Sequence, residues 1–177
     1  AIVSRFPITQ VFGLARDASG LGVRLRIGDT PARDVVVWVV HLGYTSYGPY
    51  AACDGASTSV MSRGEKRSGR LRQINDVLKR MRPQLSEAGT MPVFLLGDFN
   101  TPSHLDWVPA AAPLHCGVTM RWPVSWKVER RGLVDVLRAV SPDPVAVPGV
   151  TWSPIFPAPE PQDRIDLIFS KGAVMPL

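Results

Sequence analysis

The sequence predicts an α/β layered domain, in which buried strands alternate with helices. Residues 35–42 and 92–97 are almost entirely apolar, and short runs of this kind are typical of strands inside a sheet that is covered on both faces. Between these runs, apolar residues recur at helical spacing over residues 64–85, with Arg and Lys between them. Strands that interleave with helices along the chain indicate an α/β layered sandwich.

The remaining elements follow from the same periodicities. Residues 1–11 predict an edge strand and a turn that Pro7 closes, and residues 21–27 alternate as a half-buried strand does. Residues 28–31 have turn composition, and residues 43–63 predict a loop long enough to be functional. After the second buried strand, Ser103 is expected to cap a short helix over residues 103–107, and a loop follows over 108–122. A helix is expected over residues 124–131, and a helix or a strand over 134–140. Residues 142–161 predict a Pro-rich loop around a short strand, and residues 164–169 predict the final strand.

Length and composition limit the class of protein. The 177 residues suit one domain with a buried core, and 45% apolar residues exclude a disordered tail. The longest apolar run is too short to span a bilayer, so no membrane span is expected, and no signal peptide is visible at the start. The net charge of +5 and the pI of about 9.7 favour an anionic partner or substrate, although a general preference for Arg explains the same charge.

The two cysteines leave the cellular compartment open. Cys53 and Cys116 do not match a metal-binding spacing such as CxxC. They are either one disulfide of a secreted protein or two unrelated thiols. Cytoplasmic and secreted locations are therefore both open.

Two polar residues directly follow the buried strand 92–97. Asp98 and Asn100 are expected on the same side of the chain, with Phe99 pointing the other way into the core. There Asp98 can orient and deprotonate a water molecule, and Asn100 can donate to a phosphate oxygen. The alternative is an Asx-turn, in which both residues only end the strand.

His41 and Asp166 complete the group of candidate catalytic residues. His41 closes the strand 35–42, where a neutral His is also a common interior polar group. Asp166 lies in an apolar strand and needs a partner, because a lone buried carboxylate is costly. That partner is either Arg164, two residues away, or a His that Asp166 orients for catalysis.

In order and spacing, these motifs resemble the endonuclease/exonuclease/phosphatase superfamily, which includes deoxyribonuclease I. The resemblance covers essentially the whole chain, and its motifs are residues 39–42, 97–100, 151–152 and 163–166. It implies a four-layered α/β sandwich of two packed, mostly antiparallel sheets flanked by helices. It also implies that residues 1–177 are a single, incomplete domain. Stretches such as residues 47–50 and 148–152 are most similar to bacterial members of the superfamily.

The resemblance also implies a role for each matching residue. His41 would contact the scissile phosphate, and Asp98 would position the attacking water. Asn100 would bind the phosphate and its developing charge, and Asp166 would hold the imidazole of a His. The implied cofactor is Mg²⁺ or Mn²⁺, and the implied substrate is a phosphoester, either a small molecule or a nucleic acid.

The sequence departs from the superfamily pattern at both ends. The Asn and the Glu that binds the metal are expected upstream of Ala1, and the terminal Ser-Asp-His is expected after Leu177. The principal metal ligand is therefore not expected within residues 1–177, and the chain reads as an internal part of a longer, monomeric protein.

Further residues are candidates for binding the rest of the substrate. Tyr47, Tyr50 and Trp152 suit aromatic walls against a base or an alkyl group, with core packing as the alternative. His104 is expected at the mouth of the cleft, unless it only caps a short helix. Arg70 is expected to reach a phosphate from the long helix, unless it is solvated as most Arg residues on such helices are.

Three functions are compatible with these features. A metal-dependent phosphodiesterase or phosphatase that attacks phosphorus in line with an activated water accounts for all of them. A DNA or RNA endonuclease is the alternative within the same family, but no basic stripe with interleaved aromatic residues is visible. A phosphate-binding module without catalysis, on the same fold, is the alternative from another class.

Overall fold

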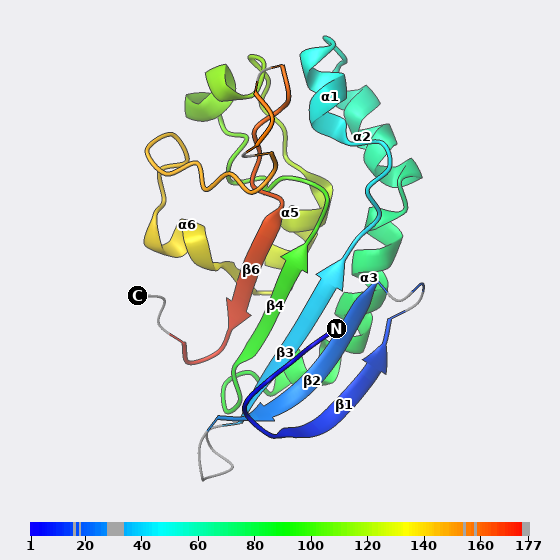
Figure 1. Ribbon diagram of the computed structural model, residues 1–177, viewed down its shortest axis with the longest axis vertical. Coiled ribbons are helices and arrows are strands. Elements are labelled where there is room, and N and C mark those ends of the chain that lie inside the picture. Colours follow the sequence, from blue (N-terminus) through cyan, green and yellow to red (C-terminus); the bar gives the residue numbers. More distant parts are fainter. Residues whose placement is uncertain (16, 18, 28–33, 154, 158, 175–177) are drawn as a thin grey trace.

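Six strands form one mixed sheet in the part of the chain that the computed structural model describes, which is residues 1–15, 17, 19–27, 34–153, 155–157 and 159–174 (Figure 1). The spatial order is β1-β2-β3-β4-β6-β5, and every neighbouring pair is antiparallel except β3 and β4. The strands are β1 (Ile8–Leu14), β2 (Gly20–Arg26), β3 (Asp34–His41), β4 (Val93–Asp98), β5 (Val134–Asp135) and β6 (Asp166–Lys171).

Helices connect the two parallel strands and cover one face of the sheet. Parallel strands need a long crossover, and here the chain passes through four helices between β3 and β4. The helices are α1 (Gly48–Cys53), α2 (Thr58–Arg67), α3 (Arg70–Arg80), α4 (Arg82–Ser86), α5 (Pro123–Glu129) and α6 (Val136–Val140), with a 3₁₀ helix at Pro109–Leu114. Among the described residues, no helix is both long and apolar enough to cross a membrane.

The core lies between the sheet and the helices α3 and α5. Alternate residues of β3, namely Val36, Trp38 and Val40, are buried against Ile74 and Val77 of α3. Strand side chains alternate between the two faces of the sheet, so these three residues lie on the same face. The apolar residues of α3 also lie on one side of that helix, and this side packs against the sheet.

The opposite face of the sheet is apolar and less covered. Val37 and Val39 of β3 are half-buried, as are Phe94 and Leu96 of β4, and Ile168 of β6 is 50% exposed. The described residues contribute one sheet of the two that the predicted four-layered sandwich requires.

The structure corrects several predicted boundaries. Residues 43–63 are not a loop throughout, because α1 and the start of α2 lie there. The predicted helix over 64–85 is three helices, interrupted at Gly69, whose φ of 86° is left-handed. Residues 103–107 form turns rather than a helix, and the predicted turn at 28–31 lies outside the described residues.

The segment whose type was open contains both alternatives. Residues 134–140 begin with β5 and continue as α6. The Asp135 side chain caps α6 by accepting a hydrogen bond from the backbone N–H of Arg138. The short predicted strand at residues 150–152 is reduced to an isolated bridge between Trp152 and Asp163.

Candidate active site

Three candidate catalytic residues lie in a row across three neighbouring strands. His41 at the end of β3 is in register with Asp98 at the end of β4, and Asp98 is in register with Asp166 at the start of β6. Residues directly opposite each other on adjacent strands have side chains on the same face. His41 Nε2 lies 3.4 Å from Asp98 Oδ2. The predicted convergence of these side chains is therefore present in the structure.

The backbone around Asp98 is shaped by a glycine and a core aromatic residue. Gly97 has a φ of 131°, and a Cβ there would lie 2.1 Å from the carbonyl oxygen of Val40, so only glycine fits. On the other side, Phe99 is fully buried and packs edge-to-face on Phe169. These two neighbours fix the direction in which Asp98 leaves the strand.

Asn100 holds the Asp98 carboxylate on both oxygens. The backbone N–H of Asn100 donates to Asp98 Oδ1 at 2.8 Å, and its Nδ2 donates to Asp98 Oδ2 at 3.2 Å. Nδ2 also donates to the carbonyl of Leu42 at 2.9 Å. Asp98 and Asn100 thus form the predicted Asx-turn and also line the candidate active site. Both hydrogens of the Asn100 amide are used within the protein, so this geometry does not leave it free to donate to a phosphate.

The charge state of Asp98 is set mainly by its partial burial. Burial raises the pKa of Asp98 above its ordinary value, and the neighbouring charge of Asp166 raises it further. The hydrogen bonds from Asn100 and the proximity of His41 act in the opposite direction. A carboxylate with a raised pKa is a stronger base, which suits a group that removes a proton from water.

A pocket of about 350 Å³ opens beside this row. Among the described residues that line it, four are aromatic and none is Lys or Arg. Its lining consists of His41, Tyr44, Tyr47, Tyr50, Asp98, Asn100, Trp152 and Ile165. The predicted aromatic candidates are therefore brought to the same pocket as His41, Asp98 and Asn100, whereas Asp166 is not among the residues that line it.

Hydrogen bonds hold in place the aromatic wall of the pocket, which Tyr47, Tyr50 and Trp152 form. The Tyr47 hydroxyl donates to Asp163 Oδ2 at 2.9 Å. The Tyr50 hydroxyl and the Trp152 indole N–H both donate to Glu160 Oε1, at 2.6 and 3.0 Å. The two tyrosine bonds tie α1 and the residue before it to the segment that leads into β6, and the Trp152 bond lies within that segment.

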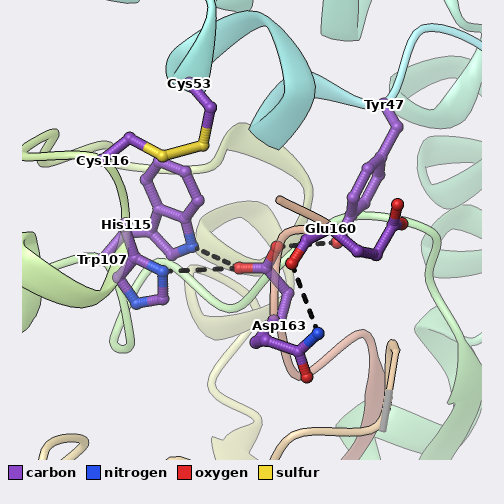
Figure 2. The surroundings of a disulfide bond; sticks show 8 residues. Tyr47, Cys53, Trp107, His115, Cys116, Glu160 and Asp163 are labelled. Atoms are coloured by element: carbon purple, nitrogen blue, oxygen red, sulfur yellow. Dashed lines mark hydrogen bonds and ion pairs between the residues drawn. A yellow bond between two sulfur atoms is a disulfide. The ribbon is translucent and has the colours of Figure 1, made fainter. Parts of the chain in front are cut away.

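A disulfide also fixes α1. Cys53, the last residue of α1, is bonded to Cys116, so the two cysteines form one disulfide and are not separate thiols (Figure 2). The disulfide lies close to Trp107, whose ring stacks on the ring of His115 (Figure 2). The wall is thus joined covalently to the loop after β4.

Two predicted substrate-binding residues do not reach the pocket. Arg70 is fully buried and bonded to Glu65, and it donates to the carbonyls of Gly43, Thr45 and Ser46. The expectation that Arg70 binds phosphate is therefore not met. It instead shapes the loop that precedes Tyr47.

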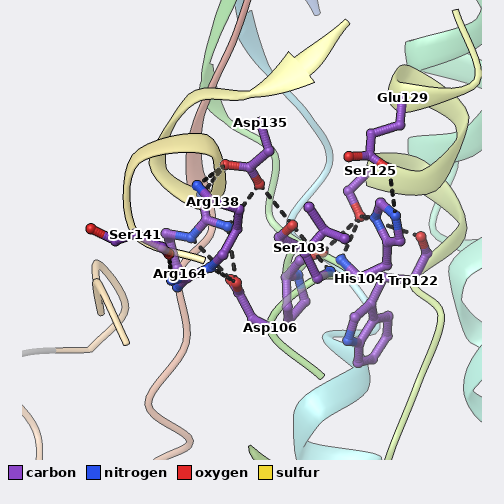
Figure 3. A network of polar contacts seen from close by, with 12 residues as sticks. Ser103, His104, Asp106, Trp122, Ser125, Glu129, Asp135, Arg138, Ser141 and Arg164 are labelled. Carbon is purple, nitrogen blue, oxygen red and sulfur yellow. Dashed lines mark hydrogen bonds and ion pairs between the residues drawn. The ribbon is translucent and has the colours of Figure 1, made fainter. Parts of the chain in front are cut away.

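His104 also lies away from the pocket. Its side chain is 8% exposed, and its ring nitrogens face Ser125 at 3.1 Å and Glu129 at 2.9 Å (Figure 3). The expectation that His104 lies at the mouth of the cleft is therefore wrong. Its burial lowers its pKa, so the imidazole tends to be neutral.

Arg164 is not the partner of Asp166. It donates to Asp106 and Asp135 through four hydrogen bonds of 2.8–3.0 Å, in a buried cluster that also contains Arg138 (Figure 3). Asp166 is exposed, and its backbone N–H donates to Thr151 Oγ1 at 3.0 Å. The buried cluster anchors the chain two residues before Asp166 and leaves the Asp166 carboxylate free for the site.

Sequence reasoning missed several residues that build the site. Tyr44 lines the pocket and is 76% exposed, and Glu160 and Asp163 hold its wall. Tyr44 is within reach of sequence analysis, because it lies in the same aromatic-rich loop as Tyr47. The roles of Glu160 and Asp163 depend on partners more than 100 residues away, as both hydrogen bonds to α1 show.

The described residues do not form a metal site on their own. None of them belongs to a group of at least three His, Cys, Asp or Glu side chains that could hold a metal ion. Asp98 and Asp166 are hard oxygen donors of the type that Mg²⁺ prefers, but two carboxylates do not complete its coordination.

The comparisons with known proteins show the family. The model of the Endonuclease/Exonuclease/phosphatase family matches residues 1–176, so the chain belongs to this family. Its members are phosphoester hydrolases, and they generally use divalent metals. A Caenorhabditis elegans relative, uncharacterized protein F14F9.5, is 38% identical over 171 residues, which cover 90% of this chain and 53% of that protein.

Solved structures confirm the fold. The catalytic domain of human nocturnin, with a bound sulfate anion, matches with a TM-score of 0.53 at 16% identity and covers 94% of this chain and 48% of that one. Truncated TDP2 from Caenorhabditis elegans matches with a TM-score of 0.53 at 15% identity, over 96% and 55%. The predicted α/β fold of the deoxyribonuclease I type is thus confirmed. The chain spans about half the length of these proteins.

Proposed function

We propose that this protein is a metal-dependent phosphoester hydrolase that uses an activated water molecule for in-line attack on phosphorus. The observation that carries the proposal is the row of His41, Asp98 and Asp166 at the ends of three adjacent strands, beside a pocket of about 350 Å³. Membership of a family of phosphoester hydrolases supports the same reaction.

Asp98 is the group that aligns and deprotonates the attacking water in this proposal. Its partial burial supports this role, since burial raises its pKa. Asn100 keeps the carboxylate in one orientation through two hydrogen bonds, which reduces the cost of ordering it for the reaction. We therefore assign Asn100 to positioning Asp98 rather than to binding the phosphate.

His41 and Asp166 take the flanking roles. The His41 side chain is 74% exposed and next to Asp98, so its imidazole is free to contact the phosphate. Asp166 is exposed and without an ion-pair partner among the described residues, which suits a carboxylate that orients a catalytic His from elsewhere in the protein.

The aromatic residues of the pocket contact the part of the substrate that does not react. Tyr44 and Trp152 are 76% and 38% exposed and are available for stacking on a flat or apolar group. Among the described residues that line the pocket, no Lys or Arg is present to bind the additional phosphates of a polynucleotide. This favours a small phosphoester over a polynucleotide.

The proposed metal requirement rests on the family rather than on a metal site formed by the described residues. We expect dependence on Mg²⁺ or Mn²⁺, as the family supports. Asp98 and Asp166 are the carboxylates near the pocket that suit Mg²⁺, and the remaining ligands would come from other residues of the protein.

The first prediction tests this function in the natural full-length protein. It should hydrolyse bis(4-nitrophenyl) phosphate or 4-nitrophenyl phosphate in the presence of Mg²⁺ or Mn²⁺, measured as release of 4-nitrophenolate. Hydrolysis should stop in EDTA and return when the metal is added in excess, because the ion neutralises charge that develops on phosphorus. Turnover that persists in EDTA would contradict the metal dependence.

A further inference from the structure

Asp163 is a buried carboxylate at the junction of three segments that form the pocket. It is 2% exposed. Its Oδ2 accepts from the Tyr47 hydroxyl at the start of α1, and its Oδ1 accepts from the Trp107 indole N–H in the loop after β4, both at 2.9 Å (Figure 2). His115 Nδ1 lies 3.6 Å from Oδ1 (Figure 2). No Lys or Arg among the described residues forms an ion pair with it.

The backbone of Asp163 is joined to the same pocket. Its N–H donates to the carbonyl of Trp152 at 2.5 Å, and its carbonyl accepts from the N–H of Trp152 at 2.9 Å. Tyr47 and Trp152 both line the pocket, as does Ile165 two residues later. Asp163 therefore connects two parts of the aromatic wall and lies three residues before Asp166.

We propose that Asp163 is a positioning residue for the proposed hydrolase, whose ionised carboxylate holds Tyr47 and the aromatic wall in the arrangement that binds substrate. The inference rests on the proposed function. Asp163 itself does not line the pocket, so it acts through Tyr47 and not on the reacting atoms.

The surroundings of Asp163 make its hydrogen bonds with Tyr47 and Trp107 dependent on pH. Burial raises its pKa to about 6, and the nearby charge of Asp106 adds to the rise, while the bonds from Trp107 and Tyr47 oppose it. The ionised form offers both oxygens as acceptors to Tyr47 and Trp107. The protonated form carries a hydrogen on one oxygen, so it must release or weaken one of these bonds as the pH falls through about 6.

The other titratable groups that face Asp163 do not reproduce this effect. Burial raises the pKa of Tyr47 far above neutrality, so this phenol remains a donor. Burial lowers the pKa of His115, which favours the neutral imidazole. Asp106 is paired with Arg138 and Arg164 in the buried cluster.

The test is the pH dependence of KM, measured separately from kcat, for bis(4-nitrophenyl) phosphate with the full-length protein. In the wild type, KM should rise about tenfold as the pH falls through about 6, since a hydrogen bond to a charged group is lost. Asp163→Asn, which cannot ionise, should have a raised KM without this step. Tyr47→Phe, which keeps the ring and removes the donor, should behave in the same way.

Tyr50→Phe is the matched control. It removes a hydroxyl from the same wall, but that hydroxyl binds Glu160 and not Asp163, so the step in KM should persist. A second readout is the NMR signal of the Trp107 indole N–H, which should titrate with a midpoint near 6 in the wild type and not in Asp163→Asn. This readout distinguishes the titration of Asp163 from a general loss of structure.

The outcomes separate this inference from the proposed function. Hydrolysis with a KM that does not change over this pH range, or with an unchanged step in Asp163→Asn, overturns the role of Asp163 alone. Absence of hydrolysis under all conditions contradicts the proposed function and this inference with it.

Discussion

At the scale of single residues, two carboxylates near the pocket are buried to different extents and serve different purposes. Asp98 is half-buried and faces the pocket, so a raised pKa makes it a better base for water. Asp163 is almost completely buried, and its pKa is raised to about 6. Its charge costs folding free energy, because neutral donors replace the water it would otherwise bind.

The second prediction follows from this cost. A carboxyl group whose pKa rises from 3.8 to about 6 on folding stabilises the fold below the lower value, and this contribution is lost as the pH rises through the higher one. Asp163→Asn should remove this loss. Between about pH 4 and about pH 7, the free energy of unfolding of the variant should therefore fall less than that of the wild type, by on the order of 3 kcal/mol. Urea unfolding at both pH values measures it, and parallel pH profiles would contradict it.

The residue scale is also where sequence reasoning had its clearest limits. His41 and Asp98 were predictable because each directly ends a buried apolar strand. Asp166 was expected inside the strand 164–169 as a buried carboxylate, but it is exposed and is the first residue of β6, because the strand begins two residues later than predicted. Arg70 was not, because charged residues on helices are usually solvated, and its burial depends on carbonyls that the fold brings from residues 43–46.

At the scale of elements, the strands were more predictable than the helices. β3 and β4 are nearly continuous apolar runs, so their existence follows from composition, whereas their neighbours in the sheet do not. α1 has only six residues and begins with Gly48 and Pro49, which reads as a turn in a sequence. The long helical pattern was divided at Gly69 because its left-handed φ cannot continue a helix.

The buried cluster of Asp106, Asp135, Arg138 and Arg164 joins elements that are distant in the chain (Figure 3). The third prediction is that Arg164→Ala destabilises the protein by about 3–5 kcal/mol, since it leaves two buried carboxylates with fewer partners. The matched control is Arg72→Ala, whose ion pair with Asp17 is exposed on both sides (78% and 56%) and should matter little. Thermal or urea unfolding compares them, and equal effects would contradict this role for the cluster.

At the scale of the whole molecule, the sheet has one face covered by helices and one apolar face that is only half-buried. The chain spans 53% of its Caenorhabditis elegans relative, and the predicted fold places a second sheet on such a face. The two-sheet arrangement followed from resemblance rather than from the periodicity of these residues, which determines only the sheet that they form.

The fourth prediction concerns residues 1–177 expressed alone. They should be nearly inactive even when folded, because they span only about half the length of the proteins that they match. Their half-buried apolar face, with Val37, Val39 and Leu96, should bind the hydrophobic dye ANS or drive self-association, whereas the full-length protein should not. Dye fluorescence and sedimentation compare the two, and full activity of residues 1–177 would contradict the expectation.

The most direct test of the account is the rate of the full-length protein with Asp98→Asn, at saturating Mg²⁺ or Mn²⁺. The amide keeps the shape of the carboxylate but cannot accept a proton from water, so kcat should fall by roughly three orders of magnitude or more. Asp166→Asn should lower kcat less, because the His that it orients would remain in the site. Thermal unfolding of both variants should stay close to the wild type. A near wild-type rate for Asp98→Asn would contradict the proposed hydrolase mechanism.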